Sequence, residues 1–137
     1  MKILFMCVAN SARSQMAEGL ARDIFGAKAE VASAGSMPKF VHPLAKKALA
    51  EIGINISSQS SKSWEDLTPE FREKLNYLIT LCAEEVCPVV SGFKAHKLHW
   101  PMLDPAGDSP SEAEQLKSFR AVRDQLKAKL LDFSKSL

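Results

Sequence analysis

The start of the chain joins an apolar run, a loop in which five residues separate a cysteine from an arginine, and an amphipathic stretch. Residues 2–6 predict a buried strand, and the apolar spacing over residues 14–25 predicts a helix that ends at Gly26. A strand, a tight loop and a helix in this order direct loop amides, an arginine and a helix N-terminus to one point, which attracts a tetrahedral oxyanion. This beginning favours an α/β sheet with its binding site at the carboxyl ends of the strands.

The loop itself suggests a nucleophile beneath an anion. The field of the loop and the helix should favour the thiolate of Cys7, and Arg13 with the loop amides forms an anion clamp. Ser14 can donate a hydrogen bond to the Cys7 sulfur. Asn10 tolerates a left-handed backbone, so we interpret it as a residue that shapes the loop. The predicted oxyanion loop consists of Val8, Ala9, Asn10, Ser11, Ala12 and Ser14.

The next segments alternate between strand and helix signals. Residues 30–34 predict a strand that ends at Gly35. A helix with proline in its first turn should follow, with an apolar stripe up to Ile52 and an end at Gly53. Residues 54–56 suggest a short strand, and the polar residues 57–63 a surface loop near the oxyanion loop.

The second half adds further residues at the same edge of the sheet. After a short helix over residues 68–75, residues 76–81 predict a strand with Cys82 at its carboxyl end. Residues 83–92, which contain Cys87, have no clear pattern. Residues 97–100 suggest the last strand and residues 104–108 a turn, whose Asp104 is a candidate proton donor. Because the carboxyl ends of parallel strands share one edge, these groups should lie near Cys7.

The last helix should begin at a capping box over residues 109–112, with proline in its first position. The whole pattern predicts a single domain, 1–137, with a flavodoxin-like parallel sheet of about four strands and helices on both faces. His42 precedes a predicted helix, and with no second histidine at metal spacing we interpret it as a loop residue.

Composition excludes several function classes. The 18 basic and 16 acidic residues give a net charge of +2, too small and dispersed to favour nucleic acid or a membrane surface as a partner. The chain has neither an apolar run long enough for a membrane span nor the pattern of a signal peptide, so we expect a cytoplasmic monomer. Three cysteines fit reactive or buried thiols better than a disulfide scaffold. No cofactor or metal site is expected.

Five motifs are distributed over the whole chain: residues 7–18, 33–35, 80–82, Trp100 with residues 104–107, and residues 119–124. Through these motifs the sequence resembles the low-molecular-weight phosphotyrosine phosphatases and the thioredoxin-coupled arsenate reductases that share their fold. The resemblance covers essentially the whole chain. Three features resemble the reductase branch: Gln15 stands where phosphatases usually have proline, Asp104-Pro105 is followed by Ala-Gly rather than an aromatic residue, and two further cysteines are present.

This resemblance implies reduction of arsenate to arsenite. Cys7 would attack arsenic while Asp104 protonates the departing oxygen, and Cys82 would then attack the Cys7 sulfur as arsenite leaves. Cys87 would resolve that disulfide and leave a Cys82–Cys87 pair for thioredoxin or glutaredoxin to reduce. Because only four residues separate Cys82 from Cys87, the choice of reductant stays open.

Some of these reductases also bind potassium near the loop through Asn, Glu, Ser and Asp side chains. Asn10, Glu18 and Ser33 match that set, but Lys62 stands at the Asp position, so we predict no potassium dependence. Two other functions remain open. The first is a phosphatase for phosphotyrosine or small phosphate esters, which needs Cys7, Arg13 and Asp104 alone. The second is an oxyanion or redox sensor without turnover.

Overall fold

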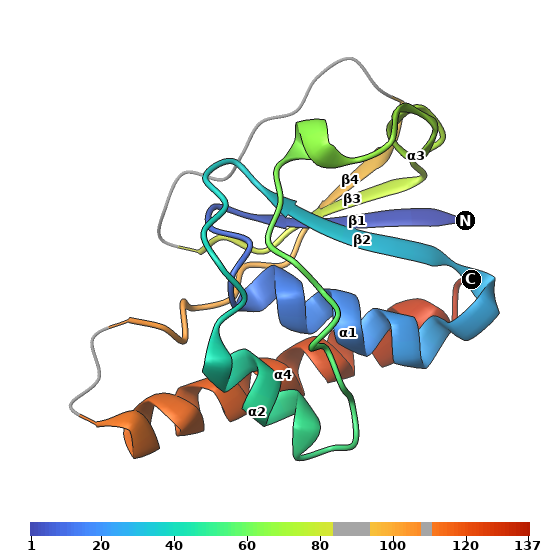
Figure 1. The fold of residues 1–137 in the computed structure, drawn as a ribbon. Coiled ribbons are helices and arrows are strands. Elements are labelled where there is room, and N and C mark those ends of the chain that lie inside the picture. Colours follow the sequence, from blue (N-terminus) through green and yellow to red (C-terminus); the bar gives the residue numbers. More distant parts are fainter. Residues whose placement is uncertain (84–93, 108–110) are drawn as a thin grey trace.

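The computed structural model of the protein describes residues 1–83, 94–107 and 111–137. Within these residues four parallel strands form one sheet in the order β2-β1-β3-β4 (Figure 1). The strands are β1 (Lys2–Cys7), β2 (Glu30–Gly35), β3 (Tyr77–Thr80) and β4 (His96–His99). Since all four run in the same direction, their carboxyl ends lie along one edge of the sheet.

Helices cover both faces of this sheet. In Figure 1, α1, α2 and α4 lie on one side of the strands, and α3 lies on the other. This arrangement confirms the predicted flavodoxin-like fold. The helices are α1 (Arg13–Phe25), α2 (Pro43–Ala50), α3 (Pro69–Glu73) and α4 (Glu112–Ser134), with short 3-10 turns η1 (Gly26–Lys28) and η2 (Trp64–Asp66).

Strand β1 is apolar after its first residue because both of its faces are buried. Alternate side chains of a strand point to opposite sides of the sheet. Ile3 and Phe5 therefore pack into the larger core, together with α1 and α4 side chains, whereas Leu4 and Met6 pack into a smaller core with Phe71 of α3. A central strand of this kind is apolar throughout rather than at every second residue.

The helix predicted to end at Gly53 is shorter than expected. α2 ends at Ala50, and the Ile54 amide returns to the Leu49 carbonyl at 2.9 Å. Gly53 has a φ of +82°, which suits the turn that follows the helix. Ile52 is consequently 36% exposed instead of belonging to the buried stripe.

The predicted strand at residues 54–56 is wrong. The segment that pairs with the end of β2 comes later in the chain: Gly35, the last residue of β2, forms a parallel bridge with Ser63. Ile56 is buried all the same, because it lies directly over Gly19 of α1. Its apolar side chain is buried because it packs on a helix, and not because it belongs to a strand of the sheet. The polar residues that follow do form a loop beside the oxyanion loop, as predicted.

The start of α4 also differs from the predicted capping box at residues 109–112. The N-cap residue is Ser111, whose hydroxyl accepts a hydrogen bond from the Glu114 amide at 3.1 Å. Ser109 and Pro110 lie outside the described residues. The sequence offers two overlapping cap patterns, and the observed one begins two residues later.

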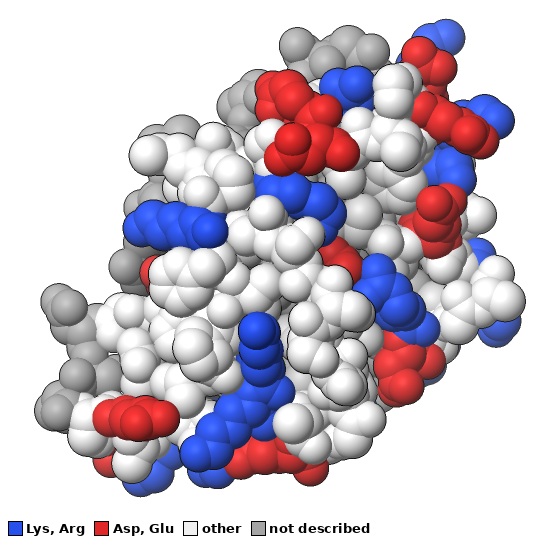
Figure 2. Space-filling view, viewed as in Figure 1, with Lys and Arg blue, Asp and Glu red and all other residues white. Residues whose placement is uncertain are grey.

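An ion cluster joins the C-terminal end of α2 to the middle of α4. Glu51 accepts hydrogen bonds from Arg120 and Arg123 of α4, and Arg123 also donates to the Ala48 carbonyl. The Arg120 hydrogen bonds, assisted by Arg123, lower the pKa of Glu51 to about 2. Elsewhere, basic and acidic side chains are interspersed on the face shown in Figure 2. Among the described helices none is both long and apolar enough for a membrane span.

Candidate functional site

A cavity of about 310 Å³ lies at the carboxyl edge of the sheet. Its walls come from the end of β1, the loop that follows it, the first residue of α1, the segment between β2 and α2, and the segment after β4. The lining residues are Cys7, Ala9, Ser11, Ala12, Arg13, Lys39, Phe40, His42, Asp104 and Ala106. Cys7, Arg13 and Asp104 are thus brought together, as the sequence predicted.

Three carbonyl groups of the oxyanion loop accept hydrogen bonds from the segments that surround the loop. The Val8 carbonyl accepts from the Met37 amide, the Ala9 carbonyl from Lys39 and the Ser61 hydroxyl, and the Ser11 carbonyl from the His42 amide. In a trans peptide the next amide points the opposite way from the carbonyl. The amides after these carbonyls are therefore directed toward the inside of the loop, where they can bind an anion.

Asn10 shapes this loop, as expected. It is the one non-glycine residue among the described positions with a positive φ, 47°. Its side chain is fully buried and donates to Ser14 Oγ at 2.8 Å, while its Oδ1 accepts from Gln15 Nε2 and from the Lys62 amide. These bonds offset the cost of the left-handed backbone.

The predicted contact between Cys7 and Ser14 is present. Cys7 Sγ lies 2.8 Å from Ser14 Oγ, and both side chains are buried. Asn10 already donates to that hydroxyl, so the Ser14 hydrogen is available to the sulfur. The Ser14 hydroxyl can therefore donate a hydrogen bond to the Cys7 sulfur at the base of the cavity.

Arg13 and Asp104 approach the cavity from two different elements. Arg13 is the first residue of α1, and its Nη1 donates to the Met102 carbonyl at 3.1 Å. Asp104 is exposed, and its Oδ1 accepts from the Ala106 amide at 3.0 Å. That bond stabilises the turn and orients the carboxyl group on the cavity wall. Val8, Asn10 and Ser14 belong to the loop but lie outside the set of residues that line the cavity.

Gly35 allows the loop to pass close to β2. A Cβ atom at this position would lie 2.5 Å from the Val8 carbonyl oxygen, and 2.9 Å from both the Asn10 nitrogen and the Cys7 oxygen. All three are backbone atoms, two of them in the oxyanion loop and one in Cys7 at the end of β1. Any larger residue would therefore displace the loop itself.

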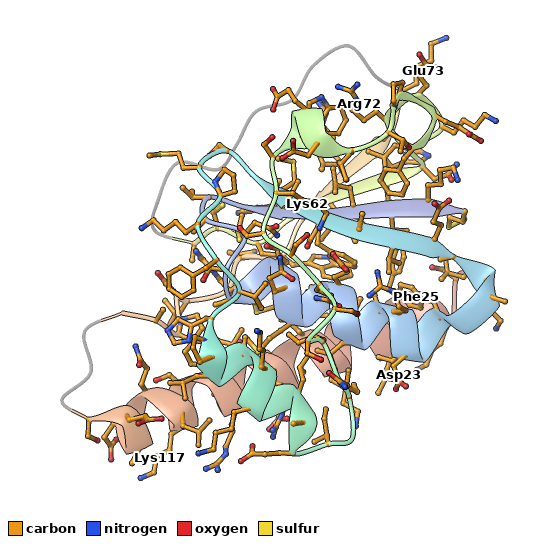
Figure 3. The ribbon with its side chains drawn as sticks, in the orientation of Figure 1. Asp23, Phe25, Lys62, Arg72, Glu73 and Lys117 are labelled. Atoms are coloured by element: carbon orange, nitrogen blue, oxygen red, sulfur yellow. The ribbon has the colours of Figure 1, made fainter. Side chains whose placement is uncertain are left out.

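A buried carboxylate lies behind the loop. Glu18 Oε1 accepts from Ser33 Oγ at 2.6 Å and lies 3.6 Å from Lys62 Nζ, while Oε2 accepts from Arg22 at 2.9 Å. Lys62 lies on the segment that connects α2 to η2 (Figure 3) and its Nζ also donates to the Ser60 carbonyl. Two cations thus balance Glu18. Within the described residues no group of three or more His, Cys, Asp or Glu side chains is arranged to hold a metal ion.

Cys82 lies at the carboxyl edge, two residues beyond β3 and next to the strand that carries Cys7. The pairing of Met6 with Thr80 continues in a hydrogen bond from the Leu81 amide to the Met6 carbonyl. Cys82 is 1% exposed and does not belong to the residues that line the cavity. Cys87 lies outside the described residues.

Four residues that line the cavity were not among the predicted site residues: Lys39, Phe40, His42 and Ala106. The first three belong to the segment between β2 and α2. One signal was available, because residues that follow a parallel strand lie at the same edge as its neighbours' loops. The interpretation of His42 as a loop residue is therefore incomplete, because His42 also lines the cavity.

Comparison with known proteins agrees with this geometry. Residues 2–137 match the family described as low molecular weight phosphotyrosine protein phosphatase. An arsenate reductase of Halalkalibacterium halodurans is 38% identical over 136 residues, which are 98% of this chain and 95% of that protein.

Two solved structures are also similar. An arsenate reductase in the phosphate binding state has a TM-score of 0.79 and 31% identity, with 98% of this chain and 97% of that chain covered. A thioredoxin-dependent arsenate reductase of Corynebacterium glutamicum has a TM-score of 0.72 and 32% identity, with 98% of this chain but only 60% of that longer chain covered. This chain belongs to the low-molecular-weight phosphotyrosine protein phosphatase family and, within it, to the group of the arsenate reductases.

Proposed function

We propose that this protein reduces arsenate to arsenite with its own cysteine thiols and is regenerated by thioredoxin. The observation that carries the proposal is the contact between Cys7 Sγ and Ser14 Oγ at the base of a cavity that Arg13 and Asp104 also line. The relatives named above supply the substrate, since arsenate is a tetrahedral oxyanion of the kind that such a loop binds.

The first step forms a bond between sulfur and arsenic. The Cys7 thiolate attacks arsenic(V) while an arsenate oxygen, protonated by Asp104, leaves as water. Arg13 and the inward-directed loop amides stabilise the charge on the remaining oxygens. No electrons have moved to arsenic at this stage.

The reduction takes place in the second step. Cys82 attacks the Cys7 sulfur, the new sulfur–sulfur bond replaces the sulfur–arsenic bond, and the electron pair stays on arsenic, which leaves as arsenite. Two thiols are oxidised and arsenic gains two electrons. The neighbouring strand ends that carry Cys7 and Cys82 support this step.

Cys87 then attacks Cys82, which frees Cys7 and leaves a Cys82–Cys87 disulfide for the reductant. The printed name of the Corynebacterium relative supports thioredoxin as this reductant. Glutaredoxin is the alternative, and the same assay with either protein distinguishes them.

The test is arsenate-dependent oxidation of NADPH through thioredoxin and thioredoxin reductase. We expect many turnovers for the parent, at most one for Cys87→Ser, which keeps Cys7 and Cys82, and none for Cys82→Ser, which lacks the thiol that releases arsenite. Circular dichroism of both variants serves as the folding control. Parental turnover in both variants would contradict the relay, and a protein that binds arsenate without any turnover would be a sensor.

One observation favours phosphatase activity as a second function. Phe40 is 56% exposed and lines the cavity, so an aromatic ring is present there although Ala106-Gly107 supply none. An aryl phosphate can stack on such a ring. Hydrolysis of p-nitrophenyl phosphate without any arsenate-dependent NADPH oxidation would make this the main activity.

We further predict that potassium does not stimulate the reaction. The Lys62 ammonium, 3.6 Å from Glu18 Oε1, supplies the positive charge behind the loop. Activity should stay constant when potassium chloride replaces choline chloride at fixed ionic strength. Lys62→Asp is the matched variant, in which a carboxylate replaces the ammonium and potassium should restore activity. Clear activation of the parent by potassium would contradict the prediction.

A further inference from the structure

His42 occupies a position between the oxyanion loop and α2. Its backbone amide donates to the Ser11 carbonyl at 3.0 Å, so the residue is tied to the loop. It is also the N-cap of α2, where its Nδ1 accepts a hydrogen bond from the Leu44 amide at 3.1 Å. The same residue lines the cavity with Cys7 and Arg13.

The cap determines where the ring carries its proton. A nitrogen that accepts a hydrogen bond has no hydrogen of its own, so the neutral imidazole must carry its proton on Nε2. Burial lowers the pKa of His42 below its usual 6.5, although the nearby Asp104 acts in the opposite direction. Protonation of Nδ1 would also break the cap and place a positive charge at a helix N-terminus. The ring is therefore a neutral donor at neutral pH.

Aromatic contacts hold this donor in place. The ring centroids of His42 and Phe119 of α4 are 4.7 Å apart, and Phe40 stacks on His42 at 6.1 Å. Within the residues that the structure describes, Nε2 has no hydrogen-bond partner, whereas Nδ1 is engaged by the cap. Nε2 is thus the polar atom that the ring can offer to a molecule in the cavity.

We propose that His42 is an oxyanion-binding residue, whose Nε2–H donates a hydrogen bond to an oxygen of the tetrahedral anion held by the loop. This inference rests on the proposed function, because it assumes that the cavity binds such an anion. It adds a contact from the N-terminus of α2 to those from the loop and from Arg13. The charged side chains that line the same cavity are Arg13, Lys39 and Asp104.

Two substitutions separate the cap from the donor. In His42→Asn the side-chain oxygen can take the place of Nδ1 and keep the cap, since asparagine is a preferred N-cap residue, but no donor reaches the position of Nε2. In His42→Gln the amide nitrogen can take the place of Nε2, but glutamine is a poor cap. If His42 has only a structural role, phosphate affinity should fall in the variant that loses stability. If His42 binds the anion, affinity should fall in the variant that keeps its stability but lacks the donor.

The measurement is the affinity for inorganic phosphate by calorimetry at neutral pH, with the thermal unfolding midpoint of each protein. We expect His42→Asn to keep the parental midpoint and to bind phosphate about tenfold more weakly, because a hydrogen bond to a charged group is lost. His42→Gln should have a lower midpoint but should recover most of the affinity.

Parental phosphate affinity in a folded His42→Asn protein would overturn the inference and leave His42 as a helix cap. An equal loss of affinity in both variants would overturn it as well. If the parent itself did not bind phosphate, the oxyanion loop and hence the proposed function would fail together with it. His42→Asn alone decides the question if His42→Gln does not fold.

Discussion

Cys7→Ser is expected to abolish arsenate reduction, with a loss of at least about 10⁴-fold in kcat, while phosphate binding persists. A serine hydroxyl is a far weaker nucleophile than a thiolate and cannot form the disulfide through which electrons leave the protein. The oxyanion contacts remain, because the loop amides and Arg13 do not depend on the sulfur. Stopped assays for arsenite and calorimetry with phosphate measure the two effects separately.

Arsenite production and phosphate binding respond to different roles of the Cys7 sulfur. A Cys7→Ser protein that lost phosphate binding as well as turnover would mean that the sulfur shapes the loop. A variant that still produced arsenite at a substantial fraction of the parental rate would show that another thiol attacks arsenic, and the assignment of Cys7 as nucleophile would be wrong.

Gly35→Ala is expected to disable the site without touching any group that carries chemistry. The added methyl would lie 2.5 Å from the Val8 carbonyl oxygen and 2.9 Å from both the Asn10 nitrogen and the Cys7 carbonyl oxygen. Since backbone cannot swing aside as a long side chain can, the loop has to shift. We expect phosphate affinity and turnover to fall by about 10²-fold and the free energy of unfolding to decrease by about 1–3 kcal/mol.

Gly107→Ala is the matched control for this experiment. Gly107 lies close to the cavity in the segment after β4, but a Cβ atom there would meet its nearest neighbour, the Asp104 carbonyl oxygen, at an ordinary 3.5 Å. Its phosphate affinity should equal that of the parent. If Gly35→Ala also bound phosphate as the parent does, the close approach of β2 would have no part in forming the loop.

Several parts of the site follow from local sequence. An apolar strand, a loop that begins with Cys7, and a helix that begins near Ser14 bring sulfur and hydroxyl together, because only a short, tightly curled segment separates them. The left-handed conformation of Asn10 was likewise predictable from its residue type. Asp104 could be assigned to the same edge because parallel strands share one direction.

Other parts could not be predicted because they depend on contacts between distant segments. Ile56 has the apolar character of a strand residue, yet it packs on α1, because the edge of β2 is occupied at Gly35 by a later residue. His42 is a single polar residue before a helix; its place after a parallel strand indicates the binding edge, but not whether its ring lies on the cavity wall. Its position follows from the bond to the Ser11 carbonyl and from its packing on Phe119.

The sequence by itself determined the fold class, the oxyanion loop and the residue types available for thiol chemistry, because each of these depends on residue types and on the order of local patterns along the chain. Only the tertiary structure decided that the segment between β2 and α2 forms a wall of the cavity and that Lys62 lies close to Glu18 behind the loop. It also decided that Gly35 lies too close to the backbone of the oxyanion loop for a Cβ atom to fit between them. The physical reason is that groups from segments far apart in the chain meet only after the sheet has set the register of its strands.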